Sequence, residues 1–147
     1  MAALDRQKIL SALQEDWGLY VQRFRQLDPE AQSAFLAQQG YKRFADLLAH
    51  VMAWWQVGYE SVQRYLANAQ AQPREIEVDV FNAEAVAKSA GFSEARVTED
   101  FERMRSFLVD FVKSLPDAAF DNERVIKQFN MEFVGHLDEH KLPGTNS

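Results

Sequence analysis

Four stretches of this chain repeat apolar residues at intervals of three and four, and this spacing constrains the fold more than any other feature. On an α-helix such residues share one face, whereas a strand would place them on both sides. The stretches span about residues 5–27, 42–70, 93–115 and 122–140. The pattern therefore predicts an all-α protein with four long amphipathic helices.

The connection between the first two long helices carries strong start and stop signals. Asp28 is placed to cap a short helix that begins at Pro29, and Gly40 is placed to end it. Pro73 closes the second long stretch. We therefore expect one short helical segment before the second long helix and a chain break after it.

Residues 74–80 alternate charged and β-branched side chains, as a strand would. One short strand cannot form a sheet, so this segment is predicted to be an extended connection. A helix of about three turns should follow, capped by Asp79 or Asn82 and ending at Gly91. Ser93 and Asn122 are the expected caps of the last two long helices.

Together these elements predict an antiparallel four-helix bundle with short extra helices between the long ones. The sequence does not decide whether one connection of this bundle is a long crossover. The length of 147 residues predicts a single domain, residues 1–147, with a loose C-terminal tail from about residue 142.

Composition and charge exclude several classes of function. A formal net charge of −6 argues against binding to a nucleic acid backbone. No apolar run approaches the roughly 20 residues that cross a bilayer, and the first residues lack a signal-peptide pattern, so we expect a cytoplasmic protein without a membrane partner. The chain has no cysteine, so a bound metal would need nitrogen and oxygen ligands.

The chain has three histidines, and their positions suggest a metal site. His136 and His140 are four residues apart, on the same helical face as Phe129 and Phe133. His50 borders the apolar face of the second long stretch. Three imidazoles can bind one divalent ion and leave a position open for a substrate. The same spacing also fits half-buried histidines bonded to backbone carbonyls, and the residues alone leave both interpretations open.

Other residues near the histidine faces are candidates for supporting roles. They are Glu132 and Glu139 as general bases, Trp54 and Tyr65 as pocket walls, Arg43 as a cation at the pocket mouth, and Asp46 as a hydrogen-bond partner of His50. Each also has an ordinary interpretation as a core or surface residue of an amphipathic helix.

Three segments, residues 40–54, residues 78–87 and the final HLDEH of residues 136–140, resemble the DinB/YfiT-like superfamily of bacterial helical proteins. His50 with Trp54 matches the family motif on the second helix, and His136 with His140 matches the HxxxH motif on the last. The sequence departs from the family at Tyr41, where tryptophan is common, and at Leu137, where an aromatic residue often stands.

The resemblance implies a four-helix bundle, often a homodimer, that holds a divalent nickel, zinc or iron ion through the three histidines. Its characterised members include transferases of low-molecular-weight thiols, a mycothiol-dependent isomerase and self-protection proteins. We therefore expect a metal-dependent thiol S-transferase or hydrolase that acts on a small electrophilic molecule. The alternatives are a non-catalytic small-molecule-binding or stress-protection protein with a vestigial or structural metal site, and a purely structural bundle.

Overall fold

The computed structural model describes residues 2–144, and within this range the chain forms helices, turns and extended connections but no β-strand. The all-α prediction is confirmed. The elements in chain order are α1 (Ala2–Ser11), the π-helical segment η1 (Ala12–Asp16), α2 (Tyr20–Gln26), α3 (Pro29–Gln39), α4 (Phe44–Ala67), α5 (Val78–Ser89), α6 (Glu94–Ser114), the 3₁₀ segment η2 (Asp117–Asp121), α7 (Glu123–Phe129), the π-helical segment η3 (Asn130–Gly135) and α8 (His136–Glu139). Over residues 2–144, no helix is both long and apolar enough to cross a membrane.

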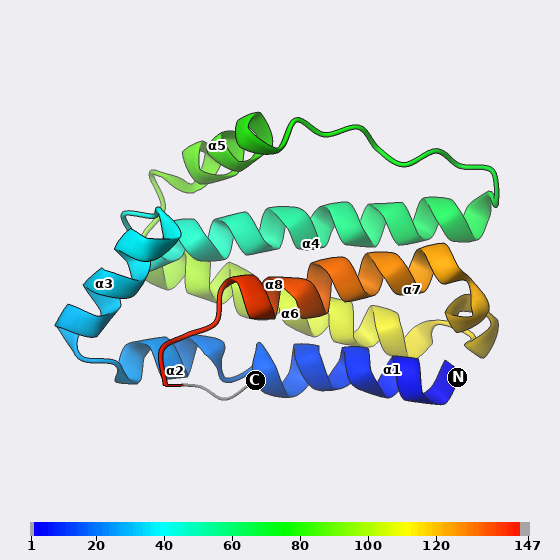
Figure 1. Cartoon of the computed structure of the whole chain (residues 1–147), viewed down its shortest axis with the longest axis horizontal. Coiled ribbons are helices and arrows are strands. Elements are labelled where there is room, and N and C mark those ends of the chain that lie inside the picture. The colour runs from blue at the N-terminus through cyan, green and yellow to red at the C-terminus, as the bar shows by residue number, and fades with distance from the viewer. Residues whose placement is uncertain (1, 145–147) are drawn as a thin grey trace.

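Helices α1, α4, α6 and α7 lie side by side along the longest axis of the molecule (Figure 1). Helix α4 packs against both α6 and α7, and α1 packs against α6. The colours of Figure 1 show that α4 and α6 run in the same direction, because residues 68–77 and α5 return along the outside of α4. The long crossover that the sequence left open is therefore present, and this pair of helices is parallel rather than antiparallel.

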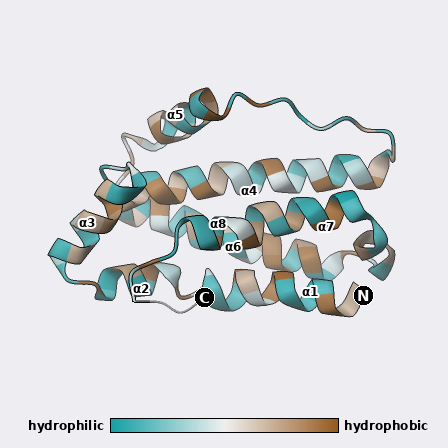
Figure 2. Ribbon diagram, viewed as in Figure 1, coloured by the Kyte–Doolittle hydropathy of each residue, from teal (hydrophilic) through white to brown (hydrophobic). Residues whose placement is uncertain are grey.

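One hydrophobic core joins these helices. Figure 2 shows hydrophobic and hydrophilic residues alternating along the helices, as expected when each buries one face. The edge of the Trp17 ring meets Trp55, with centroids 5.3 Å apart, and Trp55 stacks on Phe101 at 4.9 Å. All three side chains are fully buried. Replacing any one of them by alanine should cost about 3–5 kcal/mol.

Two of the predicted long helices are interrupted by π-helical turns, which the periodicity did not indicate. The first helical stretch contains η1, and the last contains η3 directly before His136. A π-turn adds a residue to the helical turn and leaves carbonyls without their usual partners. The indole Nε1–H of Trp17, just after η1, donates to the carbonyl of Phe133 within η3 at 2.8 Å. The two irregular segments therefore support each other.

Several local signals in the sequence are confirmed. Asp28 caps α3 by accepting a hydrogen bond from the backbone of Ala31, and Gly40 ends that helix with a φ of 84°. Such a left-handed conformation favours glycine. Ser93 and Asn122 cap α6 and α7 with their side chains.

Two local predictions were wrong. Helix α5 begins at Val78 with Glu77 at its N-cap position, so neither Asp79 nor Asn82 caps it. Leu142, where the loose tail was expected to begin, is only 3% exposed and packs in the core. Its apolar side chain explains the difference, because burial offsets the cost of ordering the backbone. Residues 145–147 of the predicted tail lie outside the described residues.

Candidate metal centre

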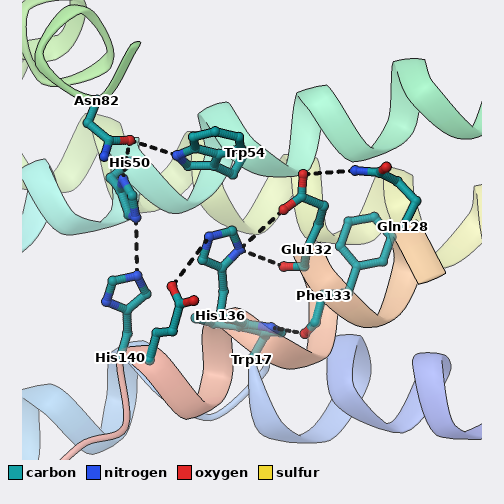
Figure 3. Close-up of polar contacts among 10 residues, drawn as sticks. Trp17, His50, Trp54, Asn82, Gln128, Glu132, Phe133, His136 and His140 are labelled. Carbon is teal, nitrogen blue, oxygen red and sulfur yellow. Dashed lines mark hydrogen bonds and ion pairs between the residues drawn. The ribbon is translucent and has the colours of Figure 1, made fainter. Parts of the chain in front are cut away.

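The three histidines come together at one place in the fold (Figure 3). His50 lies on α4, His136 is the first residue of α8, and His140 follows its last residue. One ring nitrogen from each lies within 4.8 Å of the others, and all three side chains are buried. The sequence prediction that these residues meet is confirmed.

Each histidine is oriented by an oxygen atom on its Nδ1 side. Nδ1 of His50 lies 3.1 Å from Oδ1 of Asn82, and Nδ1 of His140 lies 2.7 Å from Oε1 of Gln39. Nδ1 of His136 lies 2.9 Å from the backbone carbonyl of Glu132. A carbonyl oxygen can only accept a hydrogen bond, so each ring carries its proton on Nδ1 and leaves Nε2 free.

Trp54 fixes the orientation of the Asn82 amide. Its indole Nε1–H donates to the same Oδ1 atom at 2.7 Å, and an indole nitrogen can only donate. The atom facing His50 is therefore the amide oxygen and not the nitrogen. Trp54 also lies beside His136, with ring centroids 6.3 Å apart. The predicted wall residue thus lies at the site and also orients a ligand through Asn82.

The geometry of the three free nitrogens fits a bound divalent ion. The Nε2 atoms of His50 and His140 are 3.1 Å apart. Two imidazoles at adjacent positions on one ion, each about 2.0–2.1 Å from it, would have nitrogens roughly 3.0–3.4 Å apart. Two nitrogens at this distance need a proton or a metal cation between them, because two unprotonated nitrogens would repel each other. The three imidazoles could therefore hold a metal ion.

The surroundings keep His50 and His140 in the neutral form that binds metals. Burial, assisted by the nearby His136, lowers the pKa of His50 to about 4, against a smaller opposing effect of Asn82. Burial, with His50 and His136, lowers the pKa of His140 to about 3. At neutral pH these two rings need not lose a proton before they bind an ion.

Glu132 is a buried carboxyl group next to His136. One of its oxygens lies 3.9 Å from Nδ1 of His136, and the other accepts a hydrogen bond from Gln128 at 3.1 Å. Burial raises its pKa to about 7, the bond from Gln128 lowers it, and the charge of Glu139 raises it. A group that titrates near neutrality suits a general acid or base.

Glycine at position 58 makes room for this carboxyl group. A Cβ atom built on Gly58 of α4 would lie 2.8 Å from Cγ of Glu132, closer than van der Waals contact allows. Glu139, the second candidate base, differs from Glu132 because its side chain is 68% exposed. Its carboxylate lies 3.9 Å from Nε2 of His136, at the solvent side of the cluster.

Tyr41 forms part of the wall around the histidines. Its ring lies 5.6 Å from that of His50. Burial, with the charges of Asp46 and Glu139, raises its pKa to about 12. The hydroxyl therefore stays protonated at neutral pH and can donate a hydrogen bond.

Arg43 and Asp46 do not act on the histidines as predicted. The Arg43 guanidinium donates to Asp46 at 3.0 Å and also to the backbone carbonyls of Ser89 and Phe92. Arg43 therefore ties the end of α5 to the start of α4. Asp46 is engaged by this arginine, and Asn82 takes the place at His50 that was expected for Asp46.

Tyr65 is not brought to the site. It lies on α4 about 22 Å from His50 along the helix axis, given 1.5 Å per residue. It is buried under the guanidinium of Arg124, which is 4.0 Å from its ring centroid. Its place on the same helical face as His50 was correct, but the distance along the helix excludes it from the metal centre.

Asn82 and Gln39 are the site residues that sequence reasoning missed. Both sit on short helices, and their roles depend on how α5 and α3 lie against the rest of the chain. Asn82 lies within the segment that carried the family resemblance, which was the one available signal.

Comparisons of the chain with protein-family models, with curated proteins and with solved structures give no match.

Proposed function

We propose that this chain is a metal-dependent enzyme of the DinB/YfiT-like kind, a four-helix bundle in which His50, His136 and His140 hold one divalent nickel, zinc or iron ion. One observation carries the proposal: one ring nitrogen from each of the three histidines lies within 4.8 Å of the others, while an oxygen atom lies at hydrogen-bond distance from each Nδ1. Such outer hydrogen bonds orient metal-binding imidazoles and increase their basicity.

The ion, when bound, would lower the pKa of a water or thiol that reaches it, and so provide a nucleophile at neutral pH. The protein itself has no thiol, so an S-transfer reaction would use a low-molecular-weight thiol cofactor. We propose thiol S-transfer to a small electrophilic molecule, or its hydrolysis, as the reaction.

The chain's own residues have separate tasks in this proposal. The three imidazoles hold the ion, and Asn82, with Trp54 behind it, holds the His50 ring in its orientation. Glu132, with a pKa of about 7, is placed to accept or release a proton next to His136. Glu139 is a second proton acceptor on the solvent side.

A non-catalytic alternative is favoured by one observation. His50, His136 and His140 are only 6%, 7% and 6% exposed. A site this closed suits a structural ion in a protein that binds or sequesters a small molecule for stress or self-protection. In either case we propose that the chain acts as a homodimer.

Metal content tests the proposed metal centre. Untagged protein should contain about one divalent ion per chain by mass spectrometry, and a His136→Ala/His140→Ala double variant should contain none. A Glu139→Gln variant is the matched control and should keep the ion, because it changes an exposed neighbour and not a ligand.

The metal-loaded protein is then mixed with bacillithiol and an electrophilic fluorophore, and loss of the free thiol is followed. Turnover by the parent but not by the double variant supports the enzyme. One ion per chain without turnover supports the non-catalytic alternative. No ion after addition of nickel, zinc or iron overturns the metal centre.

A further inference from the structure

A cavity lies on another side of α4, away from the three histidines. It is a cavity of about 430 Å³ between α4, α5 and α6. Its walls are largely apolar, and they include Met52, Ala53, Val57, Phe81, Val97 and Met104. None of the three histidines lines it. Its volume is within the range of small-molecule sites in proteins.

Helix α5 covers this cavity without filling it. In Figure 1, α5 lies over the N-terminal half of α4, at the outside of the molecule. Of the residues in α5, only Ser89 is buried, although Phe81 and Ala85 line the cavity. An ordinary surface helix would bury its apolar stripe against its neighbours. The packing under α5 is therefore incomplete.

Polar contacts hold α5 in this position. Near its start, Asn82 binds His50 and Trp54. At its end, Arg43 donates to the carbonyls of Ser89 and Phe92. These bonds hold the first half and the end of the helix above α4, and Ala53 on α4 contributes only a small side chain to the cavity wall. Hydrogen bonds thus hold α5 over the cavity.

The charged side chains at the rim of the cavity do not favour a charged ligand. Glu60 faces Arg74 with 4.0 Å between their charged atoms. Asp100 pairs with Arg96 at 3.3 Å and with Arg103 at 3.5 Å. The other two charged residues of the wall, Glu84 and Lys88, have opposite signs. A charged ligand would meet no excess of the opposite charge here.

We propose that this cavity is a second binding site, which takes an uncharged apolar small molecule of the size of one to three aromatic rings. Apolar cavities smaller than this one bind benzene in other proteins. The methionines Met52 and Met104 offer flexible, polarisable contacts to such rings. Phe81 separates this site from the metal centre, since its ring also packs on Trp54 at 4.7 Å. The proposal does not depend on the metal.

Titration with N-phenyl-1-naphthylamine, an uncharged aromatic probe whose fluorescence rises in apolar surroundings, tests the site. We expect saturable binding of one probe per chain. An Ala53→Phe variant, which fills the cavity from α4, should weaken binding by about tenfold or more. A Phe107→Ser variant is the control, because Phe107 is half exposed beside Tyr59 and lies outside the cavity.

Circular dichroism shows whether Ala53→Phe folds, and Ala85→Phe fills the same cavity from α5 if it does not. Absence of saturable binding to the parent overturns the proposal. So does binding that survives cavity filling and is lost in Phe107→Ser. The His136→Ala/His140→Ala variant should bind the probe as the parent does, and Ala53→Phe should keep its metal. The proposals for the cavity and for the metal centre can thus be overturned independently of each other.

Discussion

Nδ1 of His50 lies 3.1 Å from Oδ1 of Asn82, although 32 residues separate the two in the chain. The contact exists because residues 68–77 lead the chain back along α4 and place α5 above the histidine. The short helix therefore serves the candidate metal centre and covers the cavity at the same time.

Replacing Asn82 by leucine should weaken metal binding by about 10- to 100-fold, because the His50 ring loses the acceptor that fixes its tautomer. Competition with a chromophoric chelator measures the affinity. Asn82→Asp keeps an acceptor oxygen and should retain binding. Gln63→Ala, which removes an exposed amide that donates to the Tyr59 hydroxyl, is the control. Equal affinities of Asn82→Leu and the parent would contradict the role of Asn82.

The metal-free protein should lose stability as the pH falls below about 6.5. His50 and His140 have folded pKa values of about 4 and 3, below the value of 6.5 in the unfolded chain. Between these values the unfolded chain binds more protons, so the stabilising contribution of the neutral rings is present above pH 6.5 and is lost on acidification. Each proton contributes about 1.4 kcal/mol per pH unit.

Glu132 affects the pH dependence of stability in the opposite direction to His50 and His140. Its folded pKa of about 7 exceeds its ordinary value of 4.5, so its contribution to stability is present below pH 4.5 and is lost as the pH rises through 7. A Glu132→Gln variant should therefore lose stability more steeply than the parent between pH 7 and 4.5. Thermal unfolding in EDTA at several pH values measures both slopes. Identical slopes would show that Glu132 titrates normally.

Gly58→Ala should destabilise the protein by about 1 kcal/mol. Alanine favours a helix over glycine by about 1 kcal/mol, but overpacking in a core costs about 1–3 kcal/mol. The added Cβ would meet Glu132 Cγ at 2.8 Å, so the steric cost should prevail. Urea unfolding measures the change.

The control for this variant is Gly91→Ala, because a Cβ atom there meets no atom within 4 Å and its φ is not positive. This control should be neutral or slightly stabilising. In a Glu132→Ala background the cost of Gly58→Ala should fall, because the Cγ contact at 2.8 Å is gone while the Cβ contact at 3.1 Å stays. An undiminished cost there would show that the Cγ contact does not cause it.

Trp17→Phe should cost about 1–3 kcal/mol more than Trp55→Phe. Both indoles are fully buried, but Trp17 donates to the Phe133 carbonyl, whereas Nε1 of Trp55 has no hydrogen-bond partner among the described residues. The first change leaves a buried acceptor unsatisfied, and the second removes an unsatisfied donor. Urea unfolding of the two variants gives the difference directly. Equal costs would mean that the bond between η1 and η3 contributes nothing net.

Local features of this protein are determined by the sequence itself. The spacing of apolar residues predicts the long helices, and Asp28, Ser93 and Asn122 predict where helices begin, because caps and periodicity act within a few residues. The shared face of His136 and His140 follows from the same helical geometry.

Features that depend on distant contacts were decided by the tertiary structure. Asn82 was one of two candidates for a helix cap but orients His50, and Tyr65 shares a face with His50 yet lies far from it. The two π-turns lie far apart in the chain, and a hydrogen bond from Trp17 to the Phe133 carbonyl joins them only in the folded protein. The sequence placed Glu132 beside the histidine face, but packing against Gly58 buries it. These outcomes depend on which surfaces pack together, and periodicity within one helix carries no information on that pairing.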